Sequence, residues 1–177
     1  NHVPRVGALA LVLALASSLA AAEAPDRKTV RIMPVGDSIT EGGKTFASYR
    51  YPLLKKLTEA GYRVEYVGSR QSESPAGPLR HEGYGGKNAE FLATAAGRSF
   101  RDHPADIVLV HAGHNHFVEE KPVEGIVGAT ESMIKAFREV TPRVTVLVAE
   151  VIPSGKLPKS AYLPELPQAL RQLAGRL

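Results

Sequence analysis

The sequence predicts an α/β fold in which helices cover both faces of a central parallel sheet. Short apolar runs that resemble buried strands alternate along the chain with amphipathic segments of helical spacing. These runs stop at small and polar residues, as strands do when they deliver functional groups to the carboxyl edge of a parallel sheet. The clearest example is residues 30–42, where the apolar run ends at Gly36-Asp37-Ser38.

The expected elements follow each other in strict alternation. Strands are predicted at residues 30–35, 62–68, 106–110 and 144–152, and helices at residues 45–60, 88–101, 126–140 and 163–177. Pro52 interrupts the first helix, whose regular part should therefore begin near Tyr51. Residues 69–87 are rich in Ser, Pro and Gly and are expected to form a long loop. Loops of this length inside a compact domain usually serve a function.

The sequence supports a prediction about each end of the chain. Residues 1–22 resemble a secretory signal peptide, with Arg5 before an apolar core and small residues at positions 20–22. The alternative, a buried N-terminal helix, would require an amphipathic period that the segment lacks. We therefore expect a secreted or periplasmic protein whose domain spans residues 23–177. The last predicted helix runs to Leu177 with no cap or following strand, so we expect this domain to lack its last strand and helix.

Composition excludes several classes of protein. The 177 residues suit one globular domain, and the net charge of +4 is weak. The basic residues are scattered without interleaved aromatic side chains, which argues against a nucleic-acid partner. No stretch after the leader is long enough to cross a membrane. The chain has no cysteine, so its core alone must stabilise it.

Ser38 has two interpretations. Gly36 permits a tight turn, after which a serine hydroxyl can lie at the start of a helix and face a cleft, as a nucleophile does. In the alternative, Asp37 and Ser38 merely cap the next helix, which both residue types commonly do.

Three groups of unusual residues should meet at one edge of the sheet. They are Gly36-Asp37-Ser38, the segment His81 to Asn88, and Gly113-His114-Asn115. Ester hydrolysis needs a nucleophile and hydrogen-bond donors directed at the oxyanion of the tetrahedral intermediate. A serine can supply the first, while a glycine N–H and an asparagine amide can supply the second.

With these residues the sequence resembles the SGNH (GDSL-type) esterase and lipase superfamily. Its blocks are matched by Gly36-Asp37-Ser38-Ile39, Gly85-Gly86 and Gly113-His114-Asn115. The resemblance implies a flavodoxin-like three-layer α/β/α sandwich with Ser38 as nucleophile. It also implies an oxyanion hole made by the Ser38 N–H, the Gly86 N–H and the Asn115 side chain. Gly86 is preferred to Gly85 because the family pattern His-Glu-Gly-x-x-Gly places the donor last.

The sequence departs from the family pattern in two places. His116 stands where the superfamily usually has Asp, which puts the local geometry in question. The Asp-x-x-His pair that supplies the general base is absent, because neither Asp102 nor Asp106 is followed by His at that spacing. We expect this pair to lie beyond Leu177, so that the chain as given turns over little or nothing.

The other polar residues receive weaker predictions. We expect Asp37, His81, Tyr84 and His114 to line the substrate side of the cleft, with rim packing as the alternative for Tyr84. Lys87 and Arg50 are expected by default to be solvated charges, with contact to a polar substrate as the alternative. His111, His114 and His116 at one strand end suggest a metal site. Gly113-His114-Asn115-His116 also resembles the terminal Gly-His-x-His of two-metal phosphoesterases, whose other blocks are missing here. We therefore expect no metal and no organic cofactor.

The predicted function is a secreted serine esterase that removes acyl groups, most simply acetyl groups, from a carbohydrate. Stretches Ser48 to Leu53 and Val67-Gly68-Ser69 also resemble members that deacetylate plant polysaccharides. Two alternatives stay open: a non-catalytic carbohydrate-binding or interaction domain on the same fold, and a metallophosphoesterase.

Overall fold

The computed structural model describes residues 28–43 and 48–177. The predicted signal peptide, residues 1–22, lies outside the described residues, as do residues 45–47 of the first expected helix. The described strands are β1 (Val30–Gly36), β2 (Val64–Tyr66), β3 (Arg70–Ser72), β4 (Leu79–Gly83), β5 (Ile107–His111) and β6 (Thr145–Val148). The helices are α1 (Ser38–Glu41), α2 (Arg50–Glu59), α3 (Ala89–Asp102), α4 (Val123–Val140) and α5 (Leu166–Ala174), with a 3₁₀ turn η1 (Val118–Glu120).

Strand β1 is the centre of the sheet. The strand order is β3-β4-β1-β5-β6, and β2 also pairs with β1. The start of β1 pairs with β2 and its end with β4, while β5 runs along its other edge. All three neighbours are parallel to β1, and the register places Gly36 opposite His111. The residues after β1 and after β5 therefore emerge side by side.

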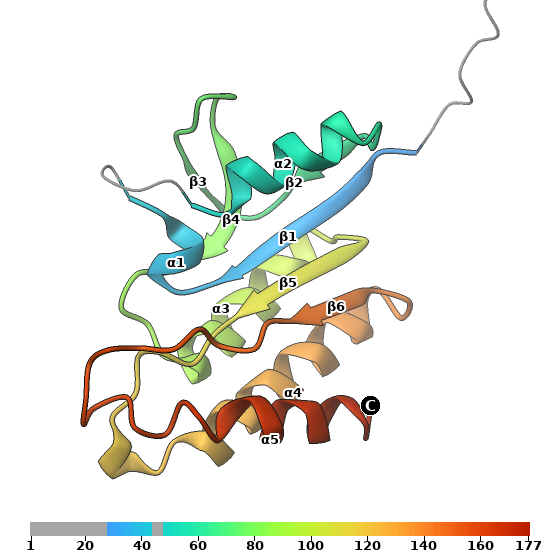
Figure 1. Ribbon diagram of the computed structural model, residues 1–177. Coiled ribbons are helices and arrows are strands. Elements are labelled where there is room, and N and C mark those ends of the chain that lie inside the picture. Colours follow the sequence, from blue (N-terminus) through green and yellow to red (C-terminus); the bar gives the residue numbers. More distant parts are fainter. Residues whose placement is uncertain (1–27, 44–47) are drawn as a thin grey trace, which may run out of the picture.

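Helices lie on both faces of the sheet, as predicted (Figure 1). On one face α3, α4 and α5 pack against Met33 and Val35 of β1 in the larger core. On the other face α2 packs through Tyr51, Leu54 and Leu57 against a smaller core that includes Ile32. Alternate residues of β1 thus serve opposite faces, which is the expected behaviour of a buried parallel strand.

The predicted loop 69–87 is wrong in part, because it contains β3 and β4. These strands are antiparallel to each other, so the sheet is mixed rather than wholly parallel. Their sequences, Arg-Gln-Ser and Leu-Arg-His-Glu-Gly, carry little apolar signal. The buried His81 and Glu82 of β4 are satisfied by hydrogen bonds instead, so hydrophobic periodicity could not reveal the strand.

The remaining elements agree with the prediction apart from their ends. Asn88 caps α3 through its side chain, which accepts a hydrogen bond from the N–H of Phe91. The strand predicted at 144–152 is shorter, since β6 ends at Val148 and irregular chain follows. Likewise α5 occupies only Leu166–Ala174 of the predicted 163–177. Within the described ranges no helix is both long and apolar enough to cross a membrane.

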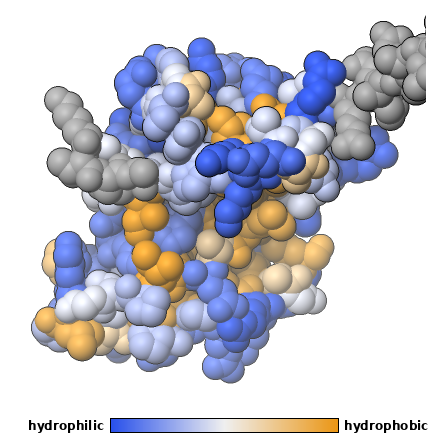
Figure 2. Space-filling view, turned by 45° about the horizontal axis from the view of Figure 1, so that its top comes forward, coloured by the Kyte–Doolittle hydropathy of each residue, from blue (hydrophilic) through white to orange (hydrophobic). Residues whose placement is uncertain are grey.

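Beside α2, part of the sheet face borders a hollow of about 330 Å³. Its lining is almost wholly apolar and includes Tyr49, Leu53, Leu109, His111 and Leu147. Figure 2 shows hydrophobic residues gathered in a recess between the upper and lower parts of this side of the molecule. His111 therefore has an apolar boundary on this side of the sheet.

Candidate active site

Ser38 lies at the carboxyl end of β1, where it is the first residue of α1. The turn depends on Gly36, since a Cβ atom there would lie 2.4 Å from the carbonyl oxygen of His111. Asp37 caps α1, because its Oδ1 atom accepts a hydrogen bond of 2.9 Å from the N–H of Ile39. Asp37 is buried, whereas Ser38 is exposed. The side chain of Asp37 is therefore the one that caps α1. The hydroxyl and N–H of Ser38 stay available at the start of this helix.

The glycine turn after β4 lies next to Ser38. Tyr84 joins the turn to β1 by donating its N–H to the Gly36 carbonyl over 2.8 Å. A Cβ atom added at Gly85 would lie 3.8 Å from Cβ of Ser38.

The Gly85 N–H donates to Oε2 of Glu41 over 2.7 Å. Gly86 has a φ of +73°, which favours glycine, and its N–H has no hydrogen-bond partner among the described residues. A free N–H at Gly86 and an occupied one at Gly85 support the choice of Gly86 as the donor.

Asn115 is tied to the same turn. Its Nδ2 atom donates a hydrogen bond of 3.0 Å to the carbonyl of Lys87. An amide nitrogen carries two N–H groups, so one remains available to a ligand. The turn from Tyr84 to Lys87 therefore lies next to Ser38 and is hydrogen-bonded to Asn115.

Ser38 and Asn115 border a common hollow of about 380 Å³. Asp37 and His114 also line it, as do residues 152–156, 159 and 160. Four of the predicted site residues are thus brought to one hollow.

A cluster of titratable groups lies behind Ser38. Oδ2 of Asp37 is 3.7 Å from Nδ1 of His114. One carboxylate oxygen of Asp37 and one ring nitrogen each of His111 and His114 lie within 4.8 Å of one another. Nε2 of His114 is 2.7 Å from the carbonyl of Ile152. Burial acts to raise the pKa of Asp37, but His114, the Ile39 N–H and His111 outweigh it, so that the pKa is lowered. The Asp37 carboxylate raises the pKa of His114, while burial lowers the pKa of His111.

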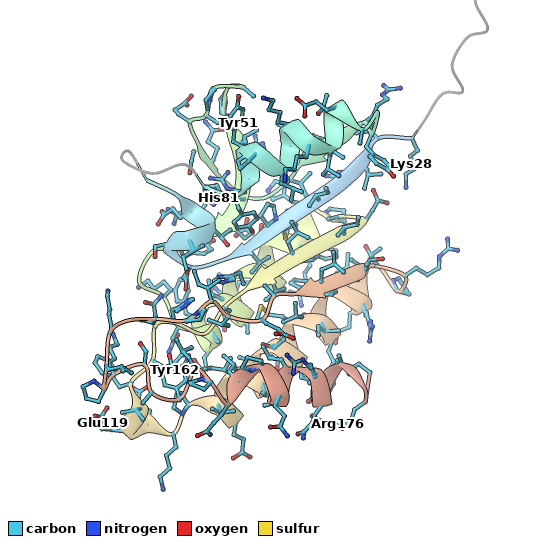
Figure 3. All side chains as sticks on the ribbon, in the orientation of Figure 1. Lys28, Tyr51, His81, Glu119, Tyr162 and Arg176 are labelled. Atoms are coloured by element: carbon cyan, nitrogen blue, oxygen red, sulfur yellow. The ribbon has the colours of Figure 1, made fainter. Side chains whose placement is uncertain are left out.

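His81 is not among the residues that line the hollow that Ser38 borders. Its side chain is fully buried and lies inside the molecule (Figure 3). Its Nδ1 atom accepts a hydrogen bond from the N–H of Gly83 over 2.8 Å, which leaves Nε2 to donate to Ser72 Oγ over 2.8 Å. Burial, together with the charges of Arg50 and Arg70, lowers the pKa of His81 to about 4.

Tyr84 packs at the rim of the turn, the alternative considered for it. Its hydroxyl donates to Oε2 of Glu82 over 2.8 Å, and the guanidinium of Arg70 lies 4.6 Å from its ring centroid. The ring also meets Phe91 edge-on. These contacts fix its orientation beside the glycine turn.

Sequence reasoning missed the roles of Glu41 and Arg50. Glu41 is bonded to the glycine turn through Gly85 and also pairs with Arg70. Arg50, expected to be a solvated charge, is 2% exposed and donates to the carbonyls of Thr40, Glu41 and Leu79. It therefore holds the end of α1 against the start of β4. No motif or periodicity in the sequence indicates either contact.

The residue that departs from the family pattern, His116, is turned away from the hollow. It is buried, with Nε2 accepting from the N–H of Ala89 over 3.3 Å and with Glu90 and Glu120 each 3.5 Å away. The segment before it is fixed by Tyr162, whose hydroxyl donates to the Gly113 carbonyl over 2.5 Å (Figure 3). His116 therefore does not join the cluster of Asp37, His111 and His114.

Comparison with known proteins agrees with this geometry. The GDSL-like Lipase/Acylhydrolase family matches residues 35–177. Among curated proteins, none matches the sequence. Among solved structures, the chain is similar to a family 3 carbohydrate esterase of Clostridium thermocellum, with 30% identity and a TM-score of 0.71 over 84% of this chain and 72% of that chain.

Two further structures are similar to the same degree. A family 3 carbohydrate esterase from Talaromyces cellulolyticus has 26% identity and a TM-score of 0.72, over 84% of this chain and 73% of that chain. A mutant acetyl esterase with an acetate ion also has 26% identity and a TM-score of 0.72, over 83% of this chain and 73% of that chain.

Proposed function

Because the chain belongs to the GDSL-like lipase/acylhydrolase family, we propose that it is a serine esterase with Ser38 as its nucleophile. Its substrate would be an acylated carbohydrate, and acetyl is the acyl group that we favour. The support for this substrate is the similarity to two carbohydrate esterases and to an acetyl esterase with acetate. No metal or organic cofactor takes part in this proposal.

One observation carries the proposal. An exposed serine at the start of a helix shares a hollow with the Asn115 amide, and a glycine turn with a free N–H lies next to Ser38 and is hydrogen-bonded to Asn115. Attack of the Ser38 hydroxyl on an ester carbonyl would give a tetrahedral oxyanion and then an acyl-enzyme. The Ser38 N–H, the Gly86 N–H and the free N–H of Asn115 are donors that this oxyanion could accept from. Water would then release the acid.

His114 is poorly placed to be the general base. A carbonyl oxygen can only accept, so Nε2 of His114 must carry a proton for Ile152, and Nδ1 faces Asp37. Neither ring nitrogen is left for the hydroxyl of Ser38. This arrangement of His114 favours a second candidate function, a carbohydrate-binding domain that keeps the esterase fold without turnover.

An activated ester separates the two candidates. p-Nitrophenyl acetate has a leaving group that needs no protonation, so a serine with an oxyanion hole can react with it even when general-base catalysis is weak. We expect the chain to release p-nitrophenol, and we expect Ser38→Ala to abolish the release while the matched variant Ser132→Ala on the exposed face of α4 does not.

Hydrolysis that persists unchanged in Ser38→Ala would remove Ser38 from the mechanism. Absence of hydrolysis in both proteins, with saturable binding of an acetylated disaccharide by calorimetry, would establish the binding domain instead.

We also propose that the protein is exported, on the strength of the leader-like residues 1–22. Expression with this leader should give a shortened protein outside the cytoplasm, which N-terminal sequencing would detect. Retention of the whole leader in the cytoplasmic fraction would contradict export.

A further inference from the structure

We propose that Asp37, His111 and His114 form a binding site for a divalent transition metal ion of the Zn²⁺ class. This departs from our expectation that no metal is bound, and it is independent of the esterase proposal because it concerns binding alone. One carboxylate and two imidazoles are a ligand set that suits Zn²⁺, Co²⁺ and Ni²⁺.

The first argument is that the three side chains converge at the carboxyl ends of two neighbouring strands, β1 and β5. The register of β1 and β5 places Gly36 opposite His111, so that Asp37 follows directly beside it. One carboxylate oxygen of Asp37 and one ring nitrogen from each histidine all lie within 4.8 Å of one another. A tetrahedral metal with bonds of about 2.1 Å keeps its ligand atoms about 3.4 Å apart. The 3.7 Å between Asp37 and His114 is already close to this spacing.

The second argument is that the facing atoms are buried and lack partners. Oδ2 of Asp37, Nδ1 of His114 and both ring nitrogens of His111 have no hydrogen-bond partner among the described residues. Asp37 is 1% exposed and His111 is 8% exposed. Buried polar atoms are nearly always satisfied, so a group of them that faces a common point indicates a missing ligand.

The third argument concerns the direction of the lone pairs. The bond from His114 Nε2 to the Ile152 carbonyl leaves Nδ1 of the neutral ring as an acceptor, and it faces the acceptor Oδ2 of Asp37. Either a proton on Nδ1 or a metal cation bound to both atoms can satisfy this facing pair. The Ile152 carbonyl would also be the outer-shell partner that orients a ligating histidine.

The remaining geometry permits a metal without breaking the fold. Asp37 uses Oδ1 to cap α1, so Oδ2 can ligate while the cap is kept. His111 holds no hydrogen bond that a small rotation toward the metal would break. The hollow that Asp37 and His114 line has room for a water molecule as a further ligand.

Titration of the protein with Co²⁺ tests the site directly. The protein should carry a purification tag that contains no histidine. We expect one Co²⁺ per chain, with the intense visible absorption of a tetrahedral site, and displacement by Zn²⁺ but not by Mg²⁺. His111→Gln, His114→Gln and Asp37→Asn should each weaken Zn²⁺ binding about 100-fold or more, because loss of an outer-shell partner alone costs 10–100-fold. Asp37→Asn retains an oxygen that can cap α1, and circular dichroism would confirm that each variant folds.

The matched control is His103→Gln, which changes a histidine at the end of α3, away from the cluster. It should bind Zn²⁺ like the unchanged chain. Absence of the Co²⁺ spectrum, or binding that His111→Gln and Asp37→Asn leave intact, would overturn the proposal. Neither result depends on hydrolysis, so failure of the metal site is distinguishable from failure of the esterase.

Discussion

The side-chain amide of Asn115 donates a hydrogen bond of 3.0 Å to the backbone carbonyl of Lys87, the residue after Gly86. This bond joins the loop after β5 to the glycine turn after β4. Two of the three proposed oxyanion donors are therefore positioned relative to each other by a direct contact between their loops. The third donor, Ser38, is next to the same turn through Gly85.

Replacing Asn115 should remove both a donor and this link. We expect Asn115→Ala to lower kcat for p-nitrophenyl acetate by about 10²–10³-fold, the usual effect of losing one oxyanion donor. Steady-state kinetics would measure it, with Ser132→Ala as the unaffected control and circular dichroism to confirm folding. An equal kcat in Asn115→Ala would exclude the amide from the oxyanion hole.

Glu41 is expected to act through the glycine turn. Its Oε2 atom accepts the Gly85 N–H, and this bond holds the turn while the next N–H, that of Gly86, remains free. Glu41→Ala should lower kcat by about 10–100-fold, because misplacement of a catalytic group by 1 Å can cost 10²-fold. KM should change little.

The conservative variant Glu41→Gln separates positioning from general stability. Its amide oxygen can still accept from Gly85, so it should recover most of the lost kcat, although the pair with Arg70 loses its charge. Glu59→Ala, on the exposed side of α2, is the control and should behave like the unchanged chain. If Glu41→Gln is as impaired as Glu41→Ala, the bond to Gly85 is not what matters.

Arg50 should contribute to stability rather than to substrate binding. Its guanidinium donates to three backbone carbonyls, and two of these, at Thr40 and Glu41, also accept from serine hydroxyls. Arg50→Met keeps the volume but removes the donors, so we expect a loss of about 3 kcal/mol in the free energy of unfolding. Urea denaturation would measure the loss, and the exposed Arg101→Met on α3 should lose well under 1 kcal/mol. Equal losses in the two variants would show that the buried bonds add nothing.

The sequence anticipated the elements whose stability comes from apolar burial and missed those that depend on polar contacts. Residues 126–140 show helical periodicity because their apolar face packs in the core, and α4 forms there. By contrast β4 is built around the buried His81 and Glu82, which are satisfied by the hydroxyls of Ser72 and Ser99 and not by apolar packing. Arg50 was misjudged for the same reason, since its three acceptors become neighbours only after folding.

The candidate site was predictable to the extent that strand ends share an edge. Placing Ser38 and Asn115 at one hollow required only the parallel order of β1 and β5. The contact between Asp37 and the two histidines required the register as well, which pairs Gly36 with His111. Register depends on details of packing and turns that no single strand encodes.

His81 makes stability depend on pH. Burial and the charges of Arg50 and Arg70 lower its pKa to about 4 in the folded protein, whereas an unfolded histidine has a pKa of about 6.5. Between these values the unfolded chain binds a proton that the folded chain does not, so stability falls as the pH is lowered from about 6.5 to about 4. The stability lost would be on the order of 3 kcal/mol, and it would be fully present above pH 6.5 or so. Urea denaturation at a series of pH values would measure it. His81→Gln should show a flatter dependence over this window, whereas His103→Gln should keep the full slope. A slope unchanged in His81→Gln would mean that another group binds the proton.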